Sequence, residues 1–196
     1  MTLTREARKA ETREAIIGAA RKLFAEQGVE ATSLDRIANE VGLTKGAIYS
    51  TFKNKDELVE AVATSTAVSL QFSGNQLFDE TIPLREGLRL LAAEIWERAE
   101  HLAQDVVQLQ LEFYLYERRH PEWGERVRRE NLEGLAEAST RLEAAAKARG
   151  ETFPVPVIEF VHAINALGLG IVQQLDSDPK SLTRESVLTL FENLAG

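Results

Sequence analysis

A short stretch near the start of the chain, LTKGAIYSTFKNKDEL at residues 43–58, combines small residues with hydroxyl and ammonium groups. Lysine and tyrosine side chains can donate hydrogen bonds to phosphate oxygens, and glycine lets a backbone approach another molecule closely. A helix that only fills a protein core would carry larger apolar residues at many of these positions. The composition therefore favours a surface that contacts a second molecule, and its lysines fit a polyanion.

Two helices are predicted before this stretch. Residues 5–27 carry apolar side chains at helical spacing, and Gly28 ends the pattern. Thr32 is expected to begin a second, two-turn helix, with Asp35 three residues later as a partner that resembles a capping box. Gly42 ends this helix and provides a tight turn into the polar stretch.

The polar stretch itself predicts a third helix and the start of a fourth. Thr44 is a suitable N-cap for residues 45–52, and Asn54 for a long helix that we expect to run from residue 55 toward residue 77. Two short helices joined by a glycine-containing turn and braced by a longer helix form a helix-turn-helix. The chain shows no alternating strand pattern of useful length and no convincing repeat, so we predict an all-α fold.

The third helix has the two faces that a DNA-reading helix needs. A major groove is about 12 Å wide, so a helix that enters it needs small or polar residues outside and a few apolar anchors inside. Ile48 and Phe52 suit the inward role. The residues that suit the outward role are Thr44, Lys45, Gly46, Tyr49, Ser50 and Lys53. A connector helix in an all-α bundle is the alternative, because many bundles contain a similar turn.

From about Arg13 to Leu58, the chain resembles the TetR (tetracycline-repressor-like) family of transcriptional regulators. The resemblance rests on LFAEQG, ATSLDRIANEVG and LTKGAIYSTFKNKDELV, which occur in order at the family's spacing and cover roughly a quarter of the chain. It implies a three-helix DNA-binding domain at residues 1–56, joined by a long helix to a helical ligand-binding and dimerisation domain at residues 57–196. The rest of the chain is similar to the family only in its length and helical character.

The resemblance also implies which residues contact DNA, namely Thr32, Ser33, Thr44, Lys45, Gly46, Ala47, Tyr49 and Lys55. Thr32 or Ser33 would bond a phosphate at the start of the second helix, through a hydroxyl group or a backbone N–H. Tyr49 and Lys55 would bond further phosphates, and Gly46 would permit close approach of the third helix. Few of these contacts read bases, so the operator sequence does not follow from them.

Contacts of other kinds are implied for the start of the third helix and for the first helix. Thr44 and Lys45 would contact the DNA backbone or base edges, and Ala47 would meet a thymine methyl group. Further minor-groove or backbone contacts are implied for Arg8, Lys9 and Arg13.

Charge is unevenly distributed along the chain. The sequence has a formal net charge of −8, yet residues 1–55 contain ten Lys/Arg and seven Asp/Glu, a net of +3 that leaves −11 for the remainder. This asymmetry favours an end that faces a polyanion. The chain contains no cysteine, no apolar leader at its start and no apolar run of the roughly 18 residues that a membrane span needs, so we expect a cytoplasmic protein without a membrane partner.

Five further helices are predicted, at residues 83–103, 105–119, 122–149, 157–175 and 182–194. The helix at residues 157–175 is apolar nearly all round, so it needs a second cover besides its own domain. We predict that it forms a homodimer interface with the last helix, through Ala163, Ala166, Leu167, Gly170, Leu188 and Phe191. A fully internal helix in a monomer is the alternative, which periodicity does not distinguish.

A cavity for a small, largely apolar effector is predicted among the middle helices. Its candidate residues are Trp96, Gln108, Glu112, Phe113, Tyr116, His162 and Asn165, with Phe72 as a further aromatic wall. A few polar groups in an apolar cavity are typical of a ligand site. Each residue is equally compatible with an ordinary core position, because neighbours usually satisfy buried polar side chains.

Two Glu-x-x-His pairs, Glu117–His120 and Glu159–His162, have the spacing of a carboxylate metal site. Such a site also needs a glutamate from each of two other helices, so we predict no metal and no cofactor. The three histidines have no Ser or Cys nucleophile at a supporting spacing, so we also predict no catalytic residue. The sequence predicts a ligand-responsive transcriptional repressor that binds a near-palindromic operator as a dimer and is released by a small molecule. A helical metal-binding enzyme and an interaction bundle without DNA binding are the alternatives.

Overall fold

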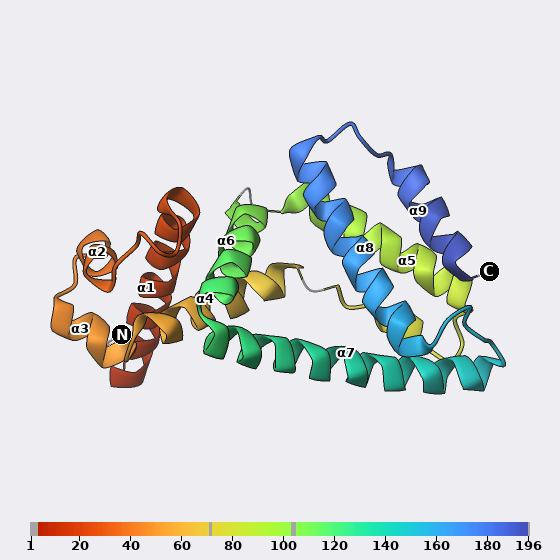
Figure 1. Cartoon of the computed structure of the whole chain (residues 1–196), viewed down its shortest axis with the longest axis horizontal. Helices are drawn as coiled ribbons and strands as arrows, with labels where there is room; N and C mark the ends of the chain where they lie inside the picture. The colour runs from red at the N-terminus through yellow and green to blue at the C-terminus, as the bar shows by residue number, and fades with distance from the viewer. Residues whose placement is uncertain (1–3, 71, 103–104, 196) are drawn as a thin grey trace. The chain divides into compact units, whose positions relative to one another are not determined.

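The computed structural model describes residues 4–70, 72–102 and 105–195, which form helices and no strand (Figure 1). The α-helices are α1 (Arg5–Gln27), α2 (Leu34–Glu40), α3 (Lys45–Thr51), α4 (Lys55–Leu70), α5 (Leu84–His101), α6 (Asp105–Arg119), α7 (Pro121–Arg149), α8 (Val157–Ser177) and α9 (Arg184–Glu192). Two 3-10 helices accompany them, η1 (Asn75–Phe78) and η2 (Asn193–Ala195). The all-α prediction is confirmed, and α1 and α6 have the predicted bounds.

The chain forms two compact units, which we call the head unit and the body unit. The head unit comprises residues 1–69 and 104–124, and the body unit comprises residues 70–103 and 125–196. α6 therefore belongs to the head unit, although it follows α5 in the sequence. The boundary after residue 56 stays a prediction, because these units divide the chain by packing and place the division elsewhere.

The core of the head unit forms where α1 meets the other helices. Phe24 of α1, Ile37 of α2 and Ile48 of α3 are fully buried, as are Phe52 and the α6 residue Leu109. Burial stabilises each such side chain by about 1.5–3 kcal/mol relative to exposure. Because helices as short as α2 and α3 are not stable alone, these anchors hold them in place.

Capping side chains set the ends of the short helices. Ser33 Oγ accepts a hydrogen bond from a backbone N–H in the first turn of α2, so Ser33 is its N-cap. The prediction of Thr32 for this position was wrong, because the Thr32 hydroxyl donates instead to the Gly28 carbonyl oxygen. Thr44 caps α3 and Asn54 caps α4, as predicted.

α4 ends at Leu70, earlier than the sequence pattern predicts. Gly74 has a left-handed backbone with φ 53°, which a continuous helix does not allow. η1 follows it, and Leu77 of η1 is buried. The apolar spacing that extended the predicted helix to residue 77 thus comes from a separate turn of chain.

α5 contacts both α8 and α9 in the body unit (Figure 1). A Cβ on Gly168 of α8 would lie 3.1 Å from the Phe72 ring and 3.2 Å from Ile95, so the absence of a side chain allows this close packing. Leu188 and Phe191 of α9 are buried within the chain. Their assignment to a dimer interface was wrong, because the packing of α9 on α5 of the same chain already covers them.

Arg149, the last residue of α7, ties three segments of the body unit together. Its guanidinium group donates to the carbonyl oxygens of Leu77 at 3.2 Å and Asp79 at 2.9 Å, and it pairs with the Glu151 carboxylate. The Arg149 side chain is only 5% exposed. Glu151 in turn accepts a hydrogen bond from the Leu84 N–H at 2.9 Å, and so caps the first turn of α5.

Candidate nucleic-acid interface

α3 has the two faces that the sequence predicts. Ile48 points into the core, whereas the exposed residues of α3 and its flanks are Thr44, Lys45, Gly46, Tyr49, Ser50 and Lys53. A Cβ on Gly46 would meet no atom of the chain within 4 Å, so packing inside the protein does not require a glycine there. Glycine in a helix costs about 0.5–1 kcal/mol relative to alanine. This cost is understandable if another molecule approaches the helix backbone at Gly46.

A concave surface of ≈ 410 Å³ adjoins α3 and the first turns of α2 and α4. Its lining residues are Glu30, Ala31, Thr32, Ser33, Leu34, Asp35, Tyr49, Lys53, Asn54 and Lys55. The structure therefore brings Ser33, Tyr49 and Lys55 together from three different helices, as a shared phosphate-binding surface requires. The lining includes two lysines, Lys53 and Lys55, and two acidic residues, Glu30 and Asp35, so the concavity carries charges of both signs.

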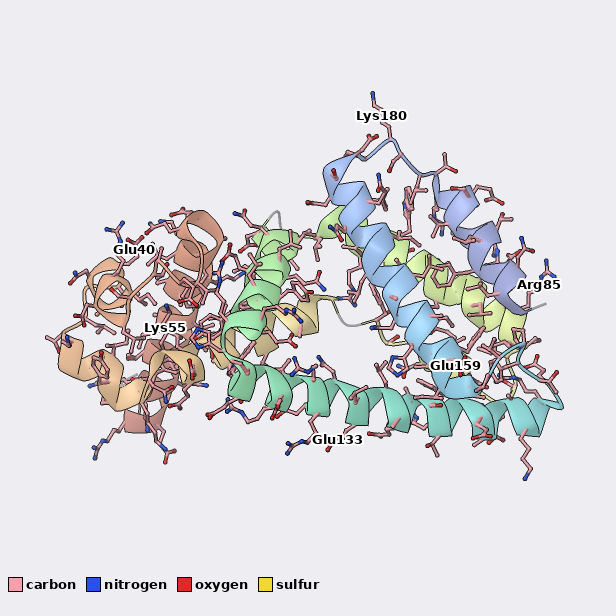
Figure 2. All side chains as sticks on the ribbon, in the orientation of Figure 1. Glu40, Lys55, Arg85, Glu133, Glu159 and Lys180 are labelled. Carbon is pink, nitrogen blue, oxygen red and sulfur yellow. The ribbon has the colours of Figure 1, made fainter. Side chains whose placement is uncertain are left out.

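Lys55 lies at the start of α4, in the head unit (Figure 2). Its ammonium group donates to the carbonyl oxygen of Glu30 at 3.1 Å. Burial lowers the pKa of Lys55, while the negative charges of Glu30 and Asp56 oppose this by favouring the charged form. The cation is thus held in one place, which would reduce the entropic cost of binding an anion there.

Lys45 is held more loosely, at the exposed start of α3. Its Nζ lies 2.8 Å from the Asp35 carboxylate and 5.8 Å from the centre of the Tyr49 ring. The hydrogen bond with Asp35 raises the pKa of Lys45. Because both charged groups are exposed, the pair contributes little to stability, and Lys45 can exchange Asp35 for a phosphate.

Thr32 is not available for the contact that the sequence assigned to it. Its side chain is 1% exposed, and its hydroxyl donates to the carbonyl oxygens of Gly28 at 2.8 Å and Leu23 at 3.4 Å. Its backbone N–H donates to the Val29 carbonyl oxygen at 3.3 Å. The prediction of Thr32 as a DNA contact is therefore corrected, and the exposed Ser33 remains the predicted contact at the start of α2.

Four polar residues of α6 bind the rest of the head unit; this set, which we call the α6 stripe, is Asp105, Gln108, Glu112 and Tyr116. The Asp105 carboxylate accepts from the Arg21 guanidinium at 2.7 Å and 2.9 Å, and the Gln108 amide donates to the Ala25 carbonyl oxygen. Glu112 accepts from the Val29 N–H at 3.0 Å, and the Tyr116 hydroxyl donates to Asp56 at 2.5 Å. The helical spacing of the four places them on one side of α6.

The α6 stripe changes the interpretation of three predicted effector contacts. Gln108, Glu112 and Tyr116 already use polar atoms within the head unit, so the structure assigns them a bracing role. The hydrogen bond from Arg21 lowers the pKa of Asp105, and burial together with the bond to Asp56 raises the pKa of Tyr116. These shifts belong to an internal hydrogen-bonded set, and the sequence does not show its partners.

The other effector candidates are divided between the two units. Phe113 is buried in the head unit, whereas Trp96 lies on α5 and His162 and Asn165 are exposed on α8 in the body unit. The body unit also has an open groove of ≈ 660 Å³ between the end of α7 and the start of α8, and none of the seven candidates lines it. The predicted pocket therefore remains a prediction.

α8 leaves much of its surface uncovered in the single chain. Ala163, Ala166 and Gly170 are exposed, and Ile158 is 38% exposed. Within the described part of the chain, α8 alone is long and apolar enough to cross a membrane by length and composition, and 28% of that window is buried. Such a helix is weak support for a membrane span. The alternative of a fully internal helix in a monomer was wrong.

The two Glu-x-x-His pairs do not form a metal site in the structure. His120 Nε2 lies 2.8 Å from the Glu30 carboxylate. Glu159 is exposed on α8 (Figure 2), and His162 of the same helix is also exposed. Across residues 4–70, 72–102 and 105–195, no group of three or more His, Cys, Asp or Glu side chains could hold a metal ion.

Two residues beside the interface, Glu30 and His120, were not anticipated from the sequence. The Glu30 carbonyl oxygen holds Lys55, and the Glu30 carboxylate faces His120. Ninety positions separate Glu30 from His120, so no local sequence pattern signals the contact.

With a capped, exposed α3 that follows α2 after a tight turn at Gly42, the head unit has the helix-turn-helix architecture of a class of DNA-binding proteins. Residues 16–62 match the family model described as "Bacterial regulatory proteins, tetR family". This part of the chain therefore carries the N-terminal domain of the TetR family, the family that the sequence resembles.

Relatives with curated descriptions and solved structures agree with this assignment. The chain is 33% identical over 109 residues to the HTH-type transcriptional regulator AcrR of Shigella flexneri, a match that covers 53% of this chain and 51% of AcrR. It thus spans about half the length of the curated relative that it matches.

The fold agreement extends over nearly the whole chain. A transcriptional regulator of the TetR/AcrR family from Thermobifida fusca YX-ER1 is 26% identical, with a TM-score of 0.61 and coverage of 94% of this chain and 96% of that one. The multidrug binding protein EbrR, solved in complex with imidazole, is 22% identical, with a TM-score of 0.68 and coverage of 98% and 97%.

Proposed function

We propose that the protein is a transcriptional repressor that binds a near-palindromic DNA operator as a homodimer and leaves it when a small molecule binds. The observation that carries the proposal is the exposed face of α3 beside the concavity that holds Lys55. An exposed helix with small and polar residues fits a major groove, and ammonium groups supply contacts to phosphates. A protein bound at an operator that overlaps a promoter would exclude RNA polymerase, which makes repression the expected outcome.

The proposed DNA contacts fall into two sets. Ser33, Tyr49 and Lys55 bind phosphates around the concavity, because their polar groups converge there. The second set lies at the start of α3. Thr44 and Lys45 contact the DNA backbone or base edges, and the small residues Gly46 and Ala47 allow α3 to enter the major groove.

Homodimerisation is supported by the uncovered face of α8. Ala163, Ala166 and Gly170 would let the α8 helix of a second copy approach closely, and Leu190 of α9 is 46% exposed. The exposed Leu190 thus takes the place of the buried Leu188 and Phe191 in the proposed interface. A two-fold dimer would present two α3 helices to successive half-sites, which explains why a near-palindrome is expected.

Release by a small, largely apolar molecule is the part of the proposal that concerns regulation. The similarity of the fold to EbrR, a multidrug binding protein, supports an effector of this kind. A ligand releases DNA only as far as it prefers a conformation in which the two α3 helices are wrongly spaced. α4 and the α6 stripe are the elements through which we expect the head unit to respond. We propose no catalytic role and a cytoplasmic location.

Selection of random DNA duplexes on the purified protein at near-physiological salt tests the proposal. We expect enrichment of one near-palindromic sequence, because a dimer reads two half-sites about one helical turn or more apart. Recovery of no enriched sequence, with only weak and salt-sensitive binding, would contradict a role as a sequence-specific repressor.

Lys55→Ala is expected to weaken DNA binding by about tenfold on every sequence, because it removes a charge-assisted bond to a phosphate. The dependence of log Kd on log salt concentration should fall by about one unit for the same reason. Tyr49→Phe should weaken binding on every sequence with little change in the salt dependence. Fluorescence anisotropy with labelled duplexes at several salt concentrations measures both quantities.

Lys180→Ala is the control, since Lys180 lies between α8 and α9 in the body unit (Figure 2). It removes the same charge outside the proposed interface. Equal affinities and salt dependences for wild type and both interface variants would remove Lys55 and Tyr49 from the interface.

A further inference from the structure

The junction of α6 and α7 carries a histidine that reaches the edge of the proposed DNA-binding surface. His120 Nε2 lies 2.8 Å from Glu30 Oε1, and the His120 ring stacks on the Tyr116 ring with their centroids 3.9 Å apart. Glu30 lines the same concavity as Tyr49 and Lys55. The imidazole of His120 therefore contacts this surface through Glu30, which lines it.

Glu30 links His120 to the lysine that we propose to bind a phosphate. Its carbonyl oxygen accepts a hydrogen bond from Lys55 Nζ at 3.1 Å, while its carboxylate faces His120. Both polar groups of Glu30 are thus engaged, one by Lys55 and the other by the imidazole. A change in the charge of His120 therefore acts on the residue that positions Lys55.

The charged and titratable groups around His120 come from several elements. Those in its hydrogen-bonded and stacked set are Glu30 of the α1–α2 turn, Lys55 and Asp56 of α4, and Tyr116 of α6. Those beside it along the chain are Glu117 and Arg119 of α6 and Glu122 of α7. When the imidazole is neutral, the hydrogen-bonded set contains two carboxylates, those of Glu30 and Asp56, and one ammonium group, that of Lys55. Protonation of His120 cancels this excess negative charge.

We propose that His120 is a positioning residue for the DNA contact of Lys55, and that protonation of His120 strengthens DNA binding. This inference rests on the proposed function in DNA binding. A protonated imidazole pairs with the Glu30 carboxylate, which otherwise repels a phosphate that approaches Lys55. DNA binding then takes up protons, so the affinity rises as the pH is lowered.

The test measures the affinity of the full-length protein for one labelled duplex of arbitrary sequence, about 30 base pairs long, at low salt, where phosphate contacts dominate binding. For the wild-type protein we expect a Kd about fivefold lower at pH 6 than at pH 8. His120→Gln should lose most of this pH dependence. Glu30→Gln should bind more tightly than wild type at pH 8, because it removes the repelling charge, and it should also lose the pH dependence.

His101→Gln is the matched control. His101 lies at the end of α5 in the body unit, where its Nδ1 lies 2.7 Å from the Glu97 carbonyl oxygen, so this variant should keep the wild-type pH dependence. Circular dichroism and thermal unfolding show whether each variant is folded, and Glu30→Gln provides a second readout if His120→Gln folds poorly.

The possible outcomes separate this inference from the proposed function. Duplex binding with the same pH dependence in wild type, His120→Gln and Glu30→Gln would overturn the role of His120 and leave DNA binding in place. Absence of any duplex binding by the wild-type protein, even at low salt, would overturn the proposed function and this inference together.

Discussion

The Ala166→Arg variant is expected to be a monomer that binds operator DNA at least about a hundredfold more weakly than the wild-type protein. Ala166 is exposed on α8, so an arginine there is solvated in the single chain. In the proposed dimer the same arginine would be buried without a partner, at a cost of about 3–5 kcal/mol for each unpaired charge. A symmetric interface contains this residue twice, so the dissociation constant of the dimer should rise by several powers of ten.

Analytical ultracentrifugation distinguishes the two states, because the chain has a mass of 21.8 kDa and the dimer has twice that mass. DNA titrations at the same protein concentrations then show whether affinity falls with the loss of the dimer. Ala136→Arg is the matched control, since Ala136 is exposed on α7, away from the proposed interface. A dimeric Ala166→Arg variant with wild-type affinity would exclude this face of α8 as the interface.

Arg149→Ala is expected to lower the free energy of unfolding by about 3 kcal/mol. The substitution leaves the Leu77 and Asp79 carbonyl oxygens without their donor and Glu151 without its cation, in a place where the Arg149 side chain was only 5% exposed. Truncation of one partner in a buried charged pair is costly because the other polar groups remain desolvated. For a chain of this length, the unfolding midpoint should fall by about 6–12 °C.

Glu151→Gln offers a graded comparison, because a glutamine oxygen can still accept the bond from the Leu84 N–H. We expect a smaller loss than for Arg149→Ala. Lys147→Ala, which changes an exposed cation in the same last turn of α7, should stay within about 0.5 kcal/mol of wild type. Thermal unfolding followed by circular dichroism gives all three values. An unchanged unfolding midpoint for Arg149→Ala would show that the contacts of Arg149 with Leu77, Asp79 and Glu151 contribute no net stability.

Helix bounds were predictable where a capping residue or a glycine marks them. Gly28 ends α1 with φ 84°, and Thr44 starts α3 by accepting a hydrogen bond from the first turn. The end of α4 was not predictable in this way. Leu77 continues the apolar spacing of that helix, and a glycine inside a helical pattern does not by itself decide between a tolerated residue and a break. Only the left-handed backbone of Gly74 settles the matter.

Residue roles were harder to predict than helices, because a role depends on the partner. The α6 stripe places polar groups at helical spacing on an apolar helix, a pattern that fits an effector cavity as well as a brace against other helices. The partners of Asp105 and Glu112 lie 84 and 83 positions away, beyond any local pattern. Leu188 and Phe191 raise the same difficulty, since periodicity identifies an apolar face but not the chain that covers it. The DNA contacts other than Thr32 stay predictions.

The membership of α6 in the head unit has a consequence for how the protein is made. During synthesis α3 leaves the ribosome long before α6, so the nascent head unit lacks Leu109, Glu112 and Tyr116 until α6 has emerged. Its apolar surface on α1 stays uncovered during that interval. A chimaera that joins only the first 69 residues to the body unit of another protein would leave this apolar surface of α1 uncovered permanently. Transfer of a complete head unit to another protein therefore calls for two grafted segments, the second of them α6.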